Sequence, residues 1–180
     1  MFTVPVENDL IKHCEALIES YNFGQRHTAN GTKEQQLTGV IGQSVISTLF
    51  GLGYVNGATG CDKGIDIIYK NKAIDVKTMG RTTDVKRSYT NNFLKLQDHF
   101  KTDIYIFCSY HKIKNELTVC GWISKPEFIL KRRYYPKGST RTRSDQSTFV
   151  TFADLYEIDI RDLVPVKNFE DLKQQLSQKI

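Results

Sequence analysis

The chain has few of the features that mark membrane, secreted or zinc-binding proteins. No apolar run approaches the roughly 20 residues of a membrane-spanning helix, and charged residues follow closely on Met1–Pro5, where a signal peptide would be apolar. The four cysteines are scattered, and none forms the C-x₂-C pair of a structural zinc site. Widely spaced thiols are typical of a reducing compartment. We therefore expect a cytoplasmic protein without a membrane segment.

Internal repeats and low-complexity segments are also missing, which argues against a solenoid or a disordered chain. The 180 residues are enough for one domain with a substantial core, and no shift in composition marks a second domain. The net charge is +5, from 25 basic and 20 acidic residues. A mildly basic chain is compatible with nucleic acid as a partner, but the charge alone does not identify one.

The hydrophobic periodicity predicts an α/β fold in which helices flank a mixed central β-sheet. Helical spacing covers 6–21 and 32–50, and Thr32 is placed to cap the second helix. Strand-like runs at 65–69 and 73–78 are joined by a polar turn, which predicts a hairpin. The other expected elements are a short helix at 92–100, strands at 102–110 and 117–123, a short helix at 125–131, strands at 149–152 and 155–160, and a helix at 168–177.

The predicted hairpin carries the most informative polar residues of the chain. Side chains alternate along a strand, so Asp75 and Lys77 share one face. If Lys70 and Asn71 form a two-residue turn, Asp66 on the first strand lies opposite Asp75. A turn one residue longer would break this register. The shorter turn predicts that two carboxylates and a lysine converge on one patch.

Such a patch suits the hydrolysis of a phosphodiester. Negative charge builds up on the phosphorane oxygens and on the leaving oxygen in the transition state. A hard divalent cation neutralises this charge, and carboxylate oxygens are the ligands that Mg²⁺ prefers. A neighbouring lysine can orient the attacking water, lower its pKa or stabilise the developing charge.

The tripeptide Asp-x-Lys alone is weak evidence, because the chain contains it three times. Asp84-Val85-Lys86 lies in a polar stretch, and Asp171-Leu172-Lys173 lies in a predicted helix. Only Asp75-Val76-Lys77 follows a strand that carries an aspartate of its own. The context, and not the tripeptide, therefore selects the site.

In this context the chain resembles the PD-(D/E)xK nuclease superfamily, which includes type II restriction enzymes, Mrr-like enzymes and archaeal Holliday junction resolvases. The matching motifs are Gly64-Ile65-Asp66 and Asp75-Val76-Lys77. Upstream, Gly39–Gln43 with Gly53-Tyr54 is similar to the first core helix of the family. The resemblance covers roughly residues 32–110. It implies a single nuclease domain over 1–180 with a restriction endonuclease-like core at about 32–124, followed by additions over 125–180.

The resemblance also implies roles for the residues of the hairpin. Asp66, Asp75 and the main-chain carbonyl of Val76 would bind Mg²⁺, with Mn²⁺ as a substitute. Lys77 would position or activate the attacking water.

The first core helix departs from the family pattern, because many members carry a Glu where Gln43 stands. A neutral amide offers a metal or a water one oxygen but brings no charge. Gln43 would complete the site, and Glu34, earlier on the same predicted helix, is an alternative. Asp62 precedes Asp66 by four positions and is either an extra ligand or a surface charge beside Lys63.

A basic and aromatic segment in the C-terminal part is the predicted DNA-binding surface. Basic and aromatic groups in alternation suit phosphate contacts and base stacking, whereas the plainer interpretation is a flexible charged loop. A second basic stretch with Arg81, Lys86 and Arg87 is a weaker candidate for the same role. The predicted DNA-binding residues are Lys131, Arg132, Arg133, Lys137, Arg141 and Arg143.

Together these patterns predict a Mg²⁺-dependent DNA endonuclease of the restriction type. A junction-resolving nuclease and a repair nuclease fit the same residues. Two further alternatives are a DNA-binding protein with an inactive nuclease core and a non-enzymatic α/β interaction protein. Cutting both strands usually needs two active sites related by symmetry, so a homodimer is expected for a restriction-type enzyme.

Overall fold

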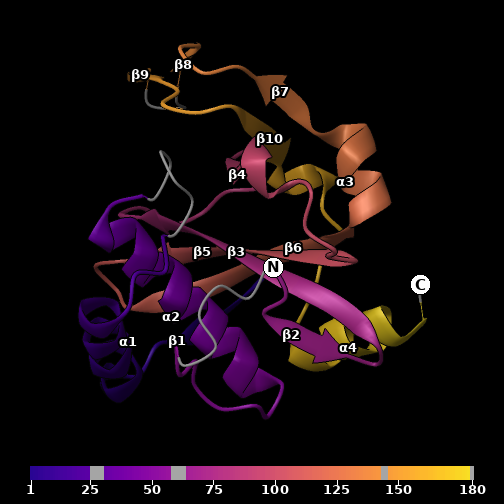
Figure 1. Cartoon of the computed structure of the whole chain (residues 1–180). Coiled ribbons are helices and arrows are strands. Elements are labelled where there is room, and N and C mark those ends of the chain that lie inside the picture. Colours follow the sequence, from indigo (N-terminus) through magenta and orange to yellow (C-terminus); the bar gives the residue numbers. More distant parts are fainter. Residues whose placement is uncertain (25–30, 58–63, 143–145, 179–180) are drawn as a thin grey trace.

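The computed structural model describes residues 1–24, 31–57, 64–142 and 146–178, which form a mixed α/β fold (Figure 1). The central sheet has five strands in the order β1 (Phe2–Pro5), β6 (Glu116–Ser124), β5 (Ile104–His111), β3 (Lys72–Arg81) and β2 (Ile67–Tyr69). Strands β3 and β5 run parallel, and the other neighbours run antiparallel. The predicted α/β class with a mixed central sheet is therefore confirmed.

Helices cover one face of the central sheet. Helices α1 (Asn8–Ser20), α2 (Lys33–Leu49) and α4 (Phe169–Gln178) share a hydrophobic core with alternate residues of β3, β5 and β6. Figure 1 shows α1 and α2 packed together on this face. Phe50, at the end of α2, contacts both Tyr69 of β2 and Phe169 of α4. None of the helices that the structure describes is long and apolar enough to cross a bilayer.

The opposite face of the central sheet carries a second layer. It consists of α3 (Lys125–Lys131) and a three-stranded sheet in the order β4 (Thr90–Leu94), β10 (Leu155–Asp159) and β7 (Arg133–Tyr135). A hairpin of β8 (Thr140–Thr142) and β9 (Thr148–Val150) lies at the outer end of this layer (Figure 1). The space between the two sheets is filled by an aromatic cluster that includes Phe93, Tyr105, Phe107, Phe128 and Tyr156.

Helix α2 begins where the sequence predicts and packs closely on β3. The Gln35 N–H donates to the Thr32 hydroxyl at 3.2 Å, and the Thr32 N–H donates to the Gln35 side chain at 3.0 Å, which is a complete capping box. A Cβ atom on Gly42 would lie 1.8 Å from the Thr78 hydroxyl oxygen of β3. Glycine at this position therefore permits the short distance between α2 and the strand that carries the site.

Several predictions of local structure are wrong. The predicted helix at 92–100 is strand β4 followed by a 3₁₀ helix at Lys95–Gln97. The residues of β4 alternate between buried and half-buried, as in a strand. This strand forms because β4 pairs with β10, which comes much later in the chain. Strand β1 is missing from the prediction, and the strand expected at 149–152 is Thr148–Val150.

Candidate active site

The hairpin of β2 and β3 has the register that the sequence predicts. Its pairing leaves Lys70 and Asn71 as a two-residue turn, with φ of 47° and 64°. Positive φ at both central positions is the mark of a type I′ turn, whose twist matches that of paired strands. Continued by one residue, the same register places Asp66 at the level of Asp75.

Regular pairing ends at Asp66, just before the start of β2. The Asp66 N–H donates to the Ile74 carbonyl at 2.9 Å, and the Asp66 carboxylate accepts the Val76 N–H at 2.6 Å. These two contacts lie on either side of Asp75 in β3. The Asp66 carboxylate therefore accepts a hydrogen bond that a main-chain carbonyl would accept in a regular strand pair. Asp66 is thereby held beside Asp75 at the edge of the central sheet.

Asp75 and Lys77 form an ion pair on the face of β3 that points away from α2. The Lys77 ammonium lies 2.7 Å from the Asp75 carboxylate, and the two side chains are only 16% and 3% exposed. The ammonium also lies 5.5 Å from the centre of the Phe93 ring, on β4. At such low exposure the attraction between the two charges offsets part of their loss of hydration.

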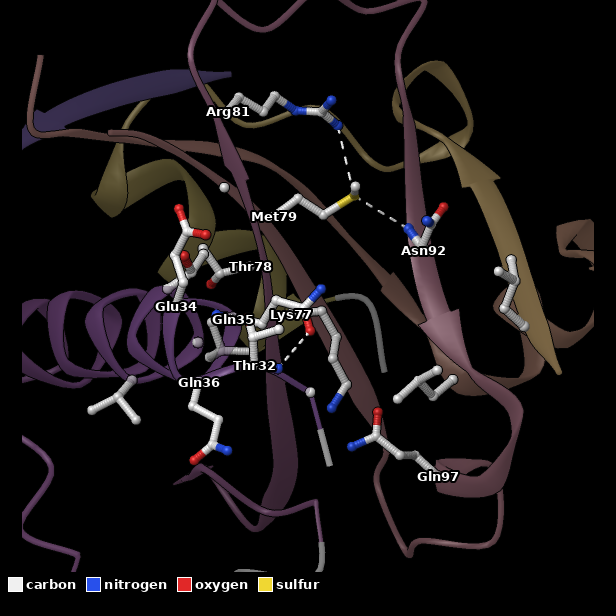
Figure 2. Close-up of a pocket in the computed structure, with 18 of the residues that line it drawn as sticks. Thr32, Glu34, Gln35, Gln36, Lys77, Thr78, Met79, Arg81, Asn92 and Gln97 are labelled. Atoms are coloured by element: carbon white, nitrogen blue, oxygen red, sulfur yellow. Dashed lines mark hydrogen bonds between the residues drawn. The ribbon is translucent and has the colours of Figure 1, made fainter. Parts of the chain in front are cut away.

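All four predicted site residues of the hairpin line one cleft, which also reaches α2. The cleft has a volume of about 1280 Å³ and lies between the N-terminal half of α2, the exposed end of β3 and the β8–β9 hairpin. Figure 2 shows its polar lining, with α2 residues on one side and Lys77, Asn92 and Gln97 around the other. Its lining includes the predicted site residues Gln43, Asp66, Asp75, Val76 and Lys77.

The two alternatives for the α2 residue that would complete the site differ in their surroundings. Gln43 is half-buried and lines the cleft. Glu34 lines it as well, but its exposed carboxylate is 2.5 Å from the Lys112 ammonium. This hydrogen-bonded partner lowers the pKa of Glu34 and satisfies its charge. Among the described residues, no cation contacts the side-chain oxygen of Gln43, in contrast to that of Glu34.

The donor set suits a hard, hydrated cation better than zinc. Within the described ranges no group of three His, Cys, Asp or Glu side chains is placed to hold a metal. Two carboxylates, Asp66 and Asp75, together with amide and main-chain oxygens, still match Mg²⁺, which binds few protein ligands and keeps several waters. Asp62, the predicted extra ligand, lies outside the described residues.

Tyr105 is a neighbour of the site that the sequence analysis missed. It pairs with Asp75 across the parallel strands β3 and β5 and is fully buried. Burial, and then the nearby carboxylates of Asp75 and Asp98, raise the pKa of the Tyr105 hydroxyl. The hydroxyl is therefore neutral next to Asp75. Only the parallel register between β3 and β5 could have revealed it, and the sequence does not show that register.

The predicted basic loop contains regular secondary structure, and its three described arginines are paired. It forms the end of α3 and strands β7 and β8. The acidic partners come from other parts of the chain, and the sequence alone does not show these pairings. The pairs are Arg132 with Asp98 at 2.5 Å, Arg133 with Asp159 at 2.8 Å and Arg141 with Glu157 at 2.7 Å.

The remaining members of the predicted DNA-binding set differ in exposure and contacts. Lys131 is exposed and donates to the Asp162 carbonyl at 3.2 Å, and Lys137 is exposed on the turn after β7. Arg141 lines the same cleft as the two aspartates. Arg143 lies outside the described residues. DNA contact by this set stays a prediction.

Comparisons with protein-family models, with curated proteins and with solved structures find no match to this chain. The function is therefore inferred from the residues and their geometry.

Proposed function

We propose that the chain is a metal-dependent DNA endonuclease with a restriction endonuclease-like core. One observation carries the proposal: Asp66 and Asp75 lie side by side at the edge of the central sheet, and Lys77 contacts Asp75 within the same cleft. Two carboxylates and a lysine are the groups that metal-assisted phosphodiester hydrolysis needs. The mixed sheet agrees with this class of fold, but many unrelated proteins share such a sheet.

In this proposal Asp66, Asp75 and the Val76 carbonyl would hold Mg²⁺, or Mn²⁺ in its place. The bound ion would supply positive charge for the phosphorane oxygens. Lys77 would donate a hydrogen bond to the attacking water and hold it beside the phosphate. Gln43 would offer a neutral oxygen to the ion or to one of its waters. The buried setting of Asp75 strengthens these electrostatic contacts, because nearby water is limited.

DNA is the proposed partner, and the cleft wall with Arg141 and the exposed Lys131 and Lys137 would face its backbone. A restriction-type enzyme that cuts both strands would act as a homodimer with two such clefts. A junction-resolving or repair nuclease would use the same residues on a different DNA structure.

The test is cleavage of supercoiled plasmid with Mg²⁺, with Mn²⁺ and with EDTA. Wild type should nick or linearise the plasmid with either metal and be inactive in EDTA. Asp66→Asn and Lys77→Ala should each lower the rate by about a hundredfold or more, since each removes a group that acts at the reacting phosphate. Far-UV circular dichroism must show that each variant is folded.

Lys173→Ala is the matched control, because Lys173 belongs to another Asp-x-Lys tripeptide on helix α4 and pairs with Glu170 at 2.7 Å. It should cleave at the wild-type rate. Full activity of a folded Asp66→Asn variant would refute the site assignment.

A DNA-binding protein with an inactive nuclease core is the second candidate, and Gln43 favours it. The position that carries a carboxylate in many PD-(D/E)xK nucleases is neutral here, which lowers the negative charge available to a cation. Gln43→Glu separates the two functions. If wild type binds DNA but does not cleave it, and Gln43→Glu gains Mg²⁺-dependent cleavage, the second candidate is correct.

A further inference from the structure

Among the described residues, Arg81 is the one cleft-lining cation without a carboxylate partner. The cleft contains three other basic side chains, and each is paired: Lys77 with Asp75, Lys112 with Glu34 and Arg141 with Glu157. Arg81 sits at the end of β3, on the face that also carries Asp75 and Lys77. Its charge is therefore uncompensated in a cleft where the others are neutralised.

The guanidinium of Arg81 is held in place but not saturated with hydrogen bonds. One amino group donates to the Thr90 carbonyl at 2.8 Å, and the guanidinium carbon lies 4.9 Å from the centre of the Tyr89 ring. Its Nε is buried and makes no hydrogen bond within the part of the chain that the structure describes. Figure 2 shows the side chain extending from β3 toward β4, with the Met79 sulfur beside it. The group therefore has a fixed orientation, and its hydrogen-bonding capacity is not filled within the described residues.

Partial burial makes this arrangement costly without an anion. Burial is the main reason that the pKa of Arg81 is lowered, and a guanidinium nevertheless stays charged in proteins. A charge that has lost water and gained no counter-ion is destabilising. An anion that enters the cleft would supply the missing partner, and a planar guanidinium is well suited to hold two oxygens of a phosphate.

We propose that Arg81 binds a backbone phosphate of the same DNA strand that the Asp66, Asp75 and Lys77 site cleaves. This inference rests on the proposed function. Arg81 follows Lys77 by four residues of one strand, or about 13 Å at about 3.3 Å per residue. That separation equals about four base steps at 3.4 Å each along a duplex. Arg81 would thus bind the DNA strand a few nucleotides away from the cleaved bond. This second contact would fix the direction in which the DNA strand runs along β3.

The test is DNA binding without a divalent metal, so that it does not depend on cleavage. A short fluorescein-labelled duplex is titrated in EDTA over a series of KCl concentrations, and fluorescence anisotropy reports the affinity. Arg81→Gln keeps a polar, hydrogen-bonding side chain and removes the charge. Its affinity should fall about tenfold, and the slope of log K against log salt should decrease by about one, because one phosphate contact is lost.

Arg161→Gln is the control, since Arg161 is an exposed arginine outside the cleft lining. It should change the affinity less than about twofold, as expected for a charge that does not touch DNA. Thermal unfolding in the absence of DNA must show that Arg81→Gln is folded, and Arg81→Lys should recover part of the salt slope. Equal affinity and slope in Arg81→Gln and wild type overturn the inference, as does an equal loss in both glutamine variants.

The result of this binding test can be distinguished from the result of the cleavage test of the proposed function. A chain that loses affinity in Arg81→Gln but never cleaves DNA keeps the phosphate contact of Arg81 and refutes the nuclease. A chain that cleaves DNA with Mg²⁺ but binds it equally well in Arg81→Gln keeps the nuclease and refutes this inference.

Discussion

Asp75 has the least exposed side chain of all the ion-paired residues that the structure describes, and Lys77 neutralises it at 2.7 Å. A second cation that binds near Asp75 would weaken this ion pair. A divalent ion at Asp66 and Asp75 would compete with the Lys77 ammonium for the Asp75 carboxylate. Lys77 would then be free to turn toward a water or a phosphate. In the proposed nuclease, the ion pair would keep the lysine close to the reacting phosphate.

Removing one partner of this pair should destabilise the fold strongly. We predict that Lys77→Met lowers the free energy of unfolding by about 3 kcal/mol at pH 7, because it removes the ammonium that neutralises a buried carboxylate. The double variant Asp75→Asn/Lys77→Met should regain most of that loss. Urea unfolding of wild type, both single variants and the double variant measures the coupling. Additive effects of the two substitutions would show that the pair is not a unit.

The hairpin could be predicted from the sequence because its signals are local. The two-residue turn at Lys70-Asn71 and the alternation along β3 lie within a few residues of Asp66, Asp75 and Lys77. Tyr105 could not be predicted as a neighbour, since its position depends on the pairing of β3 with β5. The partners of the arginines were likewise hidden, because the sequence does not show which carboxylates the second layer brings to them.

At the scale of elements, helix α2 and strand β3 form the wall that holds the site. They meet at Gly42, where a Cβ atom would lie 1.8 Å from the Thr78 hydroxyl and 2.7 Å from the Thr78 Cβ. Gly39, one turn earlier on α2, has no atom within 4 Å of such a Cβ. Two glycines of one helix therefore differ in the room around them.

Alanine at these two positions should have opposite effects. Gly42→Ala should destabilise the protein by about 1–3 kcal/mol, because α2 or β3 must shift to admit the methyl group. Gly39→Ala should leave stability unchanged or raise it by up to about 1 kcal/mol, since alanine favours the helix. Thermal unfolding of both variants measures this difference. Equal effects would mean that α2 does not pack on β3 as closely as described.

Strand β4 shows why some elements could not be predicted from local signals. Its sequence Thr90–Leu94 has one strongly apolar buried residue, Phe93, and a buried Asn91, so the alternation of burial is not visible as a hydrophobic pattern. Pairing with β10 makes it a strand. The cap of α2 at Thr32, by contrast, uses only residues next to it in sequence, and it was predicted correctly.

At the scale of the whole molecule, ion pairs tie the second layer together. Asp159 at the end of β10 is contacted by Arg133 of β7 at 2.8 Å and by Arg161 at 3.1 Å. Hydrogen bonds from Arg133 are the main reason that the pKa of Asp159 lies below its ordinary value. A depressed carboxyl pKa means that the unfolded chain binds more protons than the folded chain near that pKa, so stability rises with pH there.

Acid should therefore weaken the fold in a specific window. The contribution of Asp159 is fully present above its unfolded pKa of about 3.9 and is lost as the pH falls through its lower folded pKa. We predict that Arg133→Gln reduces stability at pH 7 and makes the free energy of unfolding less dependent on pH below about 4. Urea unfolding between pH 2.5 and pH 7 measures both effects. An unchanged pH profile in Arg133→Gln would contradict the assigned cause of the shift.

The most direct test of the central claim is a crystal structure of the chain with Mn²⁺ and a short DNA duplex. Anomalous scattering locates Mn²⁺ without assumptions about the protein. The account predicts an anomalous peak within about 2.3 Å of oxygens from both Asp66 and Asp75, with Lys77 facing the phosphate. Bound DNA with no Mn²⁺ at these carboxylates, and with Lys77 still paired to Asp75, would contradict it.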